Sequence, residues 1–273
     1  MDTPKMHKWD PADYQKSSSA QYNWAMALIA DLKLEGEERI LDIGCGDGRI
    51  TAHLAGLVPS GSVLGIDLSP EMISFAADRH GNQPNLSFRV GNASELHFIE
   101  EFDLVVSFAC LHWVKDHLSV LKAVRQSLVP GGRFLMQCGG RGNAARILDL
   151  TDDLTTRAPW KEYFSGFSFP YHFYGPEDYR TWLAEAGLQP RRAELVAKDM
   201  VHQGQAGLEG IIRNTWLPYT ERLPVYLRDG FVREIAGRYL ERYPLDEKGQ
   251  AHVQMMRLEV EAEKPCAGEA ACR

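Results

Sequence analysis

Apolar and polar positions alternate with two different periods between residues 39 and 139. Short runs that are almost continuously apolar, such as "RILDI" (39–43) and "FDLVVSFA" (102–109), alternate with helix-like stretches such as "LSVLKAVRQSL" (118–128). Strands that are apolar on both faces and separated by amphipathic helices are typical of a parallel sheet with helices on both sides. The pattern therefore predicts a doubly wound, Rossmann-like α/β domain.

The segments on either side of this core carry further patterns. Residues 19–32 have Trp24 and Leu28 at helical spacing, which predicts a leading helix that packs on the sheet or lies over its upper edge. Residues 205–242 are mainly helical in pattern, and "HVQMMRLEVEAEK" (252–264) alternates as a strand does. We expect a seven-stranded sheet, mostly parallel with the last strand antiparallel, and a helical cap inserted before that strand. The predicted regions are an N-terminal helical segment over the ligand site (1–36), the α/β core (37–204), the cap (205–250), the final strand (251–263) and a disordered tail (264–273).

Composition narrows the class of protein. Hydrophobic residues make up 44% of the chain, which is enough for a core, and the net charge of −7 comes without any basic block. Nucleic acid is therefore a disfavoured partner, because affinity for phosphate backbones comes largely from clustered positive charge. The five cysteines form no CxxC pair, and no apolar stretch could span a bilayer. We expect a cytoplasmic protein away from membranes, either a monomer or a homodimer.

A glycine-rich turn is the first sign of chemistry. In "ERILDIGCGDGRI" (38–50), Gly44, Gly46 and Gly48 lie where a strand should give way to a helix. Glycines there permit positive φ and let a ligand approach the main chain, although a tight turn without a ligand would also use them. The spacing is GxGxG and not the GxGxxG typical of dinucleotide sites, which argues against a nicotinamide cofactor. Asp67 ends the next strand, where a carboxylate can accept both ribose hydroxyl protons of an adenosine or simply cap a helix.

Four successive motifs carry a family resemblance. "LDIGCGDG", "GIDLS" followed by Met72, "VGNASEL" and "FDLVVSFACLHW" resemble, in order and spacing, the motifs of the class I methyltransferases that use S-adenosylmethionine. The resemblance implies S-adenosyl-L-methionine as the cofactor and S-adenosyl-L-homocysteine as the product. It also implies that the backbone of Gly44 and Gly46 faces the methionine portion and that Asp67 binds the ribose.

The same resemblance gives further positions individual roles. Leu68 and Met72 would flank the adenine, and Asp42 would orient the glycine loop. Asn92 and Ala93 would meet the adenine edge. The family more often has aspartate at the position of Asn92, but an asparagine oxygen can still accept a hydrogen bond from the adenine amino group. The cofactor contacts expected from the resemblance also include Cys45 and Ala109.

A narrower resemblance comes from both ends of the chain. "WDPADY" at the start, "LHWVKDH" after the fourth strand and "YLERYPLDEKGQ" before the last strand are similar to markers of the trans-aconitate methyltransferase group. This resemblance implies a polycarboxylate acceptor, with Tyr14 and Gln21 over the cofactor and Gln21 near its carboxylate. The group tends to carry an arginine ahead of a proline in the cap, where this chain has Leu217.

Sequence motifs say less about the residues that bind the methyl acceptor than about those that bind the cofactor. A carboxylate has a pKa near 4 and needs no general base, whereas a phenol, hydroxyl or amine needs one, for which His112 after the fourth strand is the best-placed residue. His112 could equally position the substrate, with Trp113 beside it as a wall of the catalytic site. No HxH or HExxH pattern is present among the nine histidines, so no metal is expected. The expected substrate-binding residues are aromatic lid or wall residues and two arginines for an anion: Tyr171, His172, Tyr174, Trp216, Arg141 and Arg213.

The sequence thus predicts an S-adenosylmethionine-dependent methyltransferase acting on a small molecule, with the carboxylate oxygen of a trans-aconitate-like acid as the expected acceptor. Methylation of a phenol, hydroxyl or amine with His112 as base is the alternative. A nicotinamide-dependent oxidoreductase, a cofactor-binding protein without catalysis and a methyltransferase acting on nucleic acid or protein are the remaining possibilities.

Overall fold

A computed structural model describes residues 19–266, except for the side chain of Asn214. Their contacts divide the chain into two compact units. Residues 19–141, 172–196 and 257–266 belong to the first, which we call the α/β unit. Residues 142–171 and 197–256 make up the second unit. The boundaries expected for the cap and the core from sequence patterns stay a prediction.

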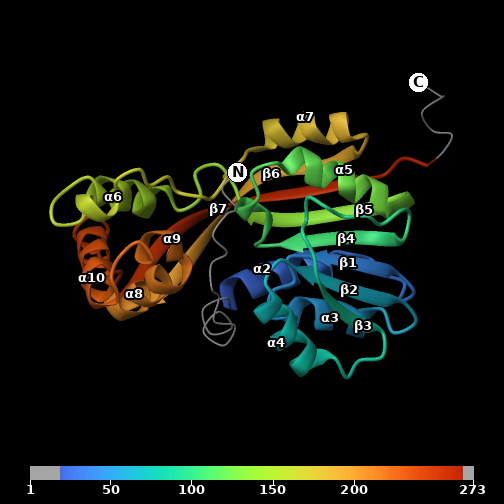
Figure 1. Cartoon of the computed structure of the whole chain (residues 1–273), viewed down its shortest axis with the longest axis horizontal. Coiled ribbons are helices and arrows are strands. Elements are labelled where there is room, and N and C mark those ends of the chain that lie inside the picture. Colours follow the sequence, from blue (N-terminus) through green and yellow to red (C-terminus); the bar gives the residue numbers. More distant parts are fainter. Residues whose placement is uncertain (1–18, 267–273) are drawn as a thin grey trace. The chain divides into compact units, whose positions relative to one another are not determined.

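The described strands form one seven-stranded sheet (Figure 1). Its strand order is β3-β2-β1-β4-β5-β7-β6. The pairs β1–β2, β1–β4, β2–β3 and β4–β5 are parallel, and β7 is antiparallel to β5. The predicted fold class, mostly parallel with an antiparallel last strand, is confirmed. The strands are β1 (Arg39–Ile43), β2 (Ser62–Asp67), β3 (Leu86–Val90), β4 (Phe102–Phe108), β5 (Leu128–Gly139), β6 (Gln189–Gln203) and β7 (Gln250–Glu263).

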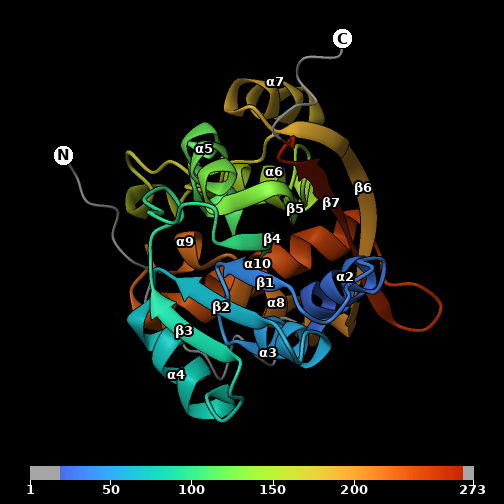
Figure 2. The same cartoon turned by 90° about the vertical axis from the view of Figure 1, so that its right-hand side faces the viewer.

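Helices cover both faces of the sheet in the α/β unit. Figure 2 shows α5 and α7 on one side of the strands and α3 and α4 on the other. The apolar residues form one core cluster with α5 and α7 and another with α2 and α3, as the near-continuous apolar strands require. The helices of this unit are α2 (Ser19–Ala30), α3 (Arg49–Leu57), α4 (Pro70–His80), the short 3₁₀ helix η1 (Leu111–Trp113), α5 (His117–Ser127) and α7 (Pro176–Ala186).

Local signals explain where these helices begin and end. Pro70 occupies the first turn of α4, and the Ser69 side chain accepts the Met72 N–H at 3.2 Å. Gly187 ends α7 in the left-handed region with φ of +75°. Helix α4 therefore begins immediately after the carboxyl end of β2, which fixes the position of Asp67.

The second unit is held together by aromatic rings. Trp160 packs edge-on against Phe231 with centroids 5.0 Å apart, and its Nε1 donates to Glu234 at 2.7 Å. The rings of Phe164 and Phe167 also pack on Tyr219. Aromatic residues from 160–167 and the rings of Tyr219 and Phe231 therefore pack together inside this unit. The unit contains α6 (Ala145–Thr155), the short 3₁₀ helix η2 (Lys161–Tyr163), α8 (Gly204–Thr215), α9 (Leu217–Thr220), α10 (Val225–Arg242) and parts of β6 and β7.

The chain stays ordered beyond β7 for at least one residue more than the sequence pattern suggested. Lys264 is 5% exposed, and its ammonium group donates to the Leu128 carbonyl at 2.6 Å and to Glu100 at 3.0 Å. Its backbone also pairs with Gly131 and Gly132. The expectation of a disordered tail starting at Lys264 is therefore wrong for this residue, whose ammonium group satisfies a buried carbonyl. Residues 267–273 lie outside the described chain.

Along residues 19–266, none of the helices combines the length and the apolar character that crossing a bilayer requires.

Candidate active site

The glycine loop that follows β1 runs in the left-handed region of backbone space. Gly44, Gly46 and Gly48 have φ of +76°, +53° and +79°. A Cβ on Gly44 would lie 2.2 Å from the Cys110 Sγ and 2.3 Å from the Cys110 Cβ. Because Cys110 follows β4, the missing side chain lets the ends of two neighbouring strands meet.

The N–H groups of this loop are bonded to protein acceptors. Gly44 and Cys45 both donate to the Ile66 carbonyl, at 2.8 and 2.9 Å. Gly46 donates to Asp67 Oδ2 at 3.0 Å, and Gly48 donates to the Cys45 carbonyl at 3.0 Å. A pyrophosphate would need such N–H groups directed at itself. The loop therefore favours a ligand other than a dinucleotide.

Carboxylates surround the loop. Asp42 is 2% exposed and accepts the Thr51 hydroxyl at 2.8 Å. Burial raises the pKa of Asp42 to about 7. The hydrogen bond from Thr51 opposes this rise, whereas the negative charges of Asp67 and Asp47 add to it. Burial also raises the pKa of Asp67, while backbone N–H donors, including that of Gly46, oppose the rise. An acid-rich site of this kind attracts a cationic ligand and repels phosphate.

Replacing Asp42 with asparagine should change how the free energy of unfolding depends on pH. The raised pKa means that Asp42 keeps a proton in the folded protein that it releases in the unfolded chain. The contribution of Asp42 to the free energy of unfolding is therefore fully present below about pH 4 and is lost as the pH rises to about 7. The variant lacks this titration. Its stability relative to wild type should rise by about 2 to 3 kcal/mol between pH 5 and pH 8. Urea unfolding at both pH values measures the change, and a difference independent of pH would contradict the assignment.

Apolar surface and an amide lie beside Asp67. Leu68 is 54% exposed although it is apolar, while Met72 in α4 is 3% exposed. Asn92 follows β3, and its Oδ1 accepts the Ser94 N–H at 3.0 Å, which leaves the oxygen a second lone pair. Asn92 also borders a hollow with Ile66, Gly91, Leu96 and Phe98, and Ala93 is the next residue along the chain.

His112 lies in η1, directly beyond the carboxyl end of β4. Its Nδ1 accepts the Gly139 N–H in a long contact of 3.5 Å, and its ring centroid is 6.0 Å from that of Trp113. Burial lowers the pKa of His112 well below 6.5, and the charge of Arg257 lowers it further. A neutral ring whose Nδ1 is an acceptor carries its proton on Nε2. His112 is therefore a hydrogen-bond donor at neutral pH.

The sequence of this chain is similar to those of known methyltransferases. Residues 41–136 match the family model described as a methyltransferase domain. A relative from Schizosaccharomyces pombe (strain 972 / ATCC 24843), the uncharacterized methyltransferase C70.08c, is 31% identical over 196 residues that cover 70% of this chain and 74% of the relative. The chain is a class I S-adenosylmethionine-dependent methyltransferase.

Further similar proteins cover more than nine tenths of the methyltransferase. A trans-aconitate 2-methyltransferase from Escherichia coli (strain K12 / DH10B) is 26% identical over 259 residues, or 95% of this chain and 99% of the relative. A solved phospholethanolamine N-methyltransferase 2 from Haemonchus contortus, in complex with phosphomonomethylethanolamine and S-adenosylhomocysteine, has a TM-score of 0.60 at 21% identity and covers 93% of this chain and 57% of its own. The predicted family, fold and cofactor are confirmed.

The methyltransferase has a buried polar atom that fits the cofactor. On helix α2, the Gln21 Oε1 is buried and has no hydrogen-bond partner among the described residues. An amide oxygen in that state is suited to accept from an ammonium group. Ala109, after β4, has a positive φ of +53° and donates its N–H to the Gln137 carbonyl at 2.7 Å. Tyr14 lies outside the described residues.

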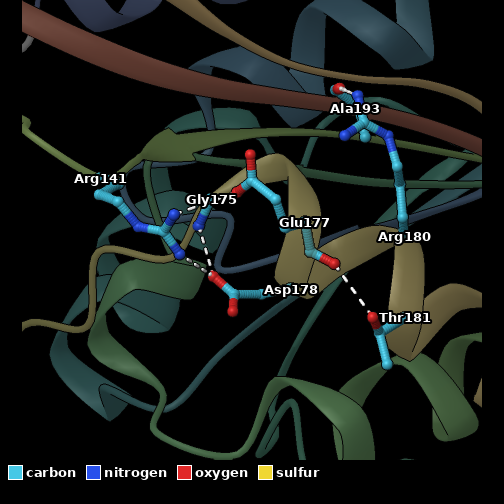
Figure 3. A network of polar contacts seen from close by, with 7 residues as sticks. All are labelled: Arg141, Gly175, Glu177, Asp178, Arg180, Thr181 and Ala193. Atoms are coloured by element: carbon cyan, nitrogen blue, oxygen red, sulfur yellow. Dashed lines mark hydrogen bonds and ion pairs between the residues drawn. The ribbon is translucent and has the colours of Figure 1, made fainter.

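Arg141, one of the two predicted anion partners in the methyltransferase, is held by acids of its own unit. Figure 3 shows its guanidinium beside Asp178, which it contacts at 2.7 Å, and Glu177 lies 3.1 Å from its other nitrogen. Asp178 also accepts the Gly175 N–H at 2.8 Å. A substrate anion at Arg141 would have to displace both carboxylates.

The other predicted substrate residues fall in both units. In the α/β unit, His172 donates its backbone N–H to the His112 carbonyl at 2.7 Å, and Tyr174 donates its hydroxyl to the Lys115 carbonyl at 2.8 Å. The remaining three lie in the second unit, where Tyr171 donates to the Thr215 carbonyl at 3.0 Å, Arg213 pairs with Asp229 at 3.1 Å and Trp216 is 4% exposed. The structure thus places Arg141, His112, Trp113, His172 and Tyr174 in one unit, and the roles of all of them stay predictions.

Sequence patterns did not single out Arg257 of β7. Its side chain is 3% exposed, and its guanidinium carbon lies 5.4 Å from the centre of the Trp24 ring. The only signal in the sequence is a cation inside an alternating strand pattern, which also fits a solvated face. Burial of that cation could be learned only from the pairing of β7.

Proposed function

We propose that the methyltransferase transfers a methyl group to a carboxylate oxygen of a small organic acid of the trans-aconitate type. The observation that carries the proposal is the contact in which His112 Nδ1 accepts the Gly139 N–H, because it engages the nitrogen that a base would use. Burial also lowers the pKa of the ring, which weakens His112 as a base. An acceptor at this position must then be ionised without help. A carboxylate, with a pKa near 4, meets that condition at neutral pH, whereas a phenol or an amine does not. Similarity over 95% of the chain to a trans-aconitate 2-methyltransferase supports the same class of acceptor.

The cofactor-binding side of the proposal uses residues at the carboxyl ends of β1, β2, β3 and β4. When bound, S-adenosylmethionine supplies an electrophilic methyl group on a sulfonium. Asp67 would hold the ribose hydroxyls, with lone pairs beyond those that accept Gly46 and Ser69. Gln21 would bind the methionine portion. The rest of the proposed set is Tyr14, Asp42, Gly44, Cys45, Gly46, Leu68, Met72, Asn92, Ala93 and Ala109.

On the acceptor side, His112 would act by positioning. Its Nε2–H can donate to one oxygen of the acceptor carboxylate and so direct the other oxygen at the methyl carbon. Holding two reactants in attack geometry can lower a barrier by roughly 7 to 11 kcal/mol. Trp113 would limit where the acceptor can lie. Proton transfer has no part in this scheme.

The full chain should be tested for methyl transfer with radiolabelled S-adenosylmethionine. Acceptors should include trans-aconitate, simpler di- and monocarboxylic acids, phenols and amines. A methyl ester releases labelled methanol on mild alkaline treatment, whereas methyl ethers and N-methyl products keep the label. Alkali-labile product from a carboxylic acid supports the proposal, and alkali-stable product from a phenol or amine overturns it.

The variant His112→Gln separates positioning from base catalysis. If His112 positions a carboxylate, turnover should fall by about 10-fold or less and the pH profile should keep its shape between about pH 6 and pH 9, because the acceptor pKa lies far below that window. If His112 is a base for a phenol, hydroxyl or amine, turnover should fall by roughly 100-fold or more, and the acidic limb of the profile should vanish. We expect the first result, measured at saturating cofactor with the wild type alongside.

Action in the cytoplasm, and existence as a monomer or homodimer, belong to the same proposal. Size-exclusion chromatography coupled to light scattering measures the oligomeric state.

A further inference from the structure

His117 is a buried histidine beside the turn that carries His112. It is the first residue of α5, it ends the "LHWVKDH" segment, and it is 1% exposed. Its Nε2 lies 2.8 Å from the Leu111 carbonyl, and its Nδ1 lies 2.6 Å from the hydroxyl of Tyr179 in α7. Leu111 is the first residue of η1, so His117 contacts the residue directly before His112. Both ring nitrogens of His117 are therefore engaged inside the protein.

The chemistry of these partners fixes the protonation of His117. A carbonyl oxygen can only accept, so Nε2 carries the proton of the bond to Leu111. Burial lowers the pKa of His117 to about 4, although hydrogen bonds to the backbone oppose this. At neutral pH the ring is therefore neutral, and its Nδ1 accepts from Tyr179. Burial also raises the pKa of Tyr179 well above its usual range, so its hydroxyl keeps the proton that it donates.

The segment that leads into α7 holds the same turn. His172 donates its backbone N–H to the His112 carbonyl at 2.7 Å, and Tyr174 donates its hydroxyl to the Lys115 carbonyl at 2.8 Å. The Tyr174 ring also packs edge-on against that of His117, with centroids 4.7 Å apart. All of these residues lie in the α/β unit. The main chain around His112 is therefore held by bonds on both sides of it, and His117 supplies a bond on its amino-terminal side.

We propose that His117 is a positioning residue, which fixes the backbone at Leu111 and thereby the place of the His112 ring relative to the acceptor. Such placement matters because a shift of about 1 Å in a group that orients a reactant can cost roughly 100-fold in rate. In this scheme His117 touches neither the cofactor nor the acceptor. The inference rests on the proposed function in one respect, because it takes His112 as the residue that orients the acceptor.

The variants His117→Gln and His117→Asn separate the two bonds of the ring in the full chain. A glutamine amide nitrogen can replace Nε2 and donate to Leu111, whereas the shorter asparagine amide can reach only toward Tyr179. With trans-aconitate as acceptor, kcat should fall by about 3- to 10-fold in His117→Asn and stay within about 2-fold of wild type in His117→Gln. Calorimetry should show S-adenosylhomocysteine binding within about 3-fold of wild type in both variants. Equal losses of kcat in the two variants would overturn the inference.

A double variant tests whether the effect passes through His112. In His112→Gln/His117→Asn, kcat should lie within about 2-fold of its value in His112→Gln alone, because the ring that His117 positions is already gone. Losses that multiply would mean a general structural role and would contradict the inference.

Leu183→Ala is the matched control for destabilisation. Leu183 is fully buried on α7, one turn after Tyr179, and its apolar side chain cannot form a hydrogen bond to the turn. The variant should have a lower melting temperature but a kcat within about 2-fold of wild type. A loss of kcat like that of His117→Asn would show that any weakening of this core slows the reaction, which would remove the specific role of His117.

Nuclear magnetic resonance tests the same point without turnover. Long-range ¹H–¹⁵N spectra of protein with labelled histidines report the tautomer of each ring, and His117→Gln and His112→Gln assign the two sets of signals. His117 should be neutral with its proton on Nε2 from about pH 6 to pH 8. The His112 signals should move in His117→Asn and not in His117→Gln. If His117→Asn unfolds, as its melting temperature would show, a proton on Nδ1 of His117 or a reduced kcat in His117→Gln overturns the inference.

These measurements keep the inference apart from the proposed function. If the wild type methylates no carboxylic acid but the His112 signals respond as expected, the proposed function fails and the positioning role of His117 stands. If the wild type methylates trans-aconitate and His117→Asn keeps the wild-type kcat, the inference fails and the proposed function stands.

Discussion

Replacing Asp67 with asparagine is expected to weaken S-adenosylhomocysteine binding by about 30-fold or more. The Asp67 carboxylate, at the carboxyl end of β2, accepts the N–H groups of Gly46 and Ser69 at 3.0 and 2.9 Å. These bonds fix its orientation before the cofactor binds, so its remaining lone pairs are available for the ribose hydroxyls. Two charge-assisted hydrogen bonds to ribose hydroxyls would be lost with the charge, at a cost of about 2 kcal/mol or more. Isothermal titration calorimetry measures the dissociation constant, and the melting temperature reports whether the loop has stayed intact.

Asp78→Asn is the matched control for Asp67→Asn. Asp78 is exposed on α4, the helix that begins three residues after Asp67, and its replacement should leave the affinity unchanged. An unaltered dissociation constant in Asp67→Asn, together with a wild-type melting temperature, would remove Asp67 from the cofactor site. A lower melting temperature in Asp67→Asn would show that its bonds to the loop also support the fold.

Replacing Gly44 with alanine should abolish cofactor binding and destabilise the α/β unit. The new Cβ would lie 2.2 Å from the Cys110 Sγ, and φ of +76° is itself unfavourable for alanine. The Cys110 Cβ is equally close at 2.3 Å, so rotation of the thiol cannot relieve the clash. Forced separation of the β1 and β4 ends should cost about 2 kcal/mol or more in the free energy of unfolding. Chemical denaturation and calorimetry with S-adenosylhomocysteine measure the two effects.

Gly56→Ala is the matched control for the glycine loop. Gly56 lies in α3, and outside the backbone of that helix no atom lies within 4 Å of an added Cβ. Alanine there should therefore stabilise the protein by about 0.5 to 1 kcal/mol and leave binding intact. Native affinity in Gly44→Ala would show that the loop is a turn without a ligand.

The fold could be predicted largely because its strands are buried on both faces. Continuous apolar runs mark β1 at Arg39–Ile43 and β2 up to Asp67, and turn residues follow each of them directly. Such runs leave few alternatives to a parallel sheet. In contrast, β6 is rich in charged residues, with alternating exposure, and its limits depend on β7 as a neighbour. No pattern in the sequence connected residues 142–171 with 197–256, which pack as one unit through aromatic contacts distant in sequence.

Sequence patterns likewise located some residues of the candidate site and missed the surroundings of others. Asp67 and the glycines could be located because strand ends determine which residues face a ligand. The surroundings of Arg141 and Arg257 could not be located, because Arg141 follows β5 and Arg257 lies inside β7, and only tertiary contacts show which of the two arginines is buried. Arg141 meets two acids of the α7 region, whereas Arg257 is buried by its pairing with β5 and by Trp24. The assigned tautomer of His112 likewise follows from a contact with the backbone N–H of Gly139, which is 27 residues away in the sequence.

The position of β7 has a consequence for synthesis on the ribosome. Among the described strands, β7 comes last in the sequence, yet it lies between β5 and β6 in the sheet (Figure 1). Until residues 250–263 have left the ribosome, the growing chain has an open edge on β5 and no partner for β6. Leu258, Val260 and Ala262 of β7 belong to the buried core of the α/β unit, so that core cannot close before residues 250–263 have been made. A chain released early would expose an apolar strand edge that favours aggregation.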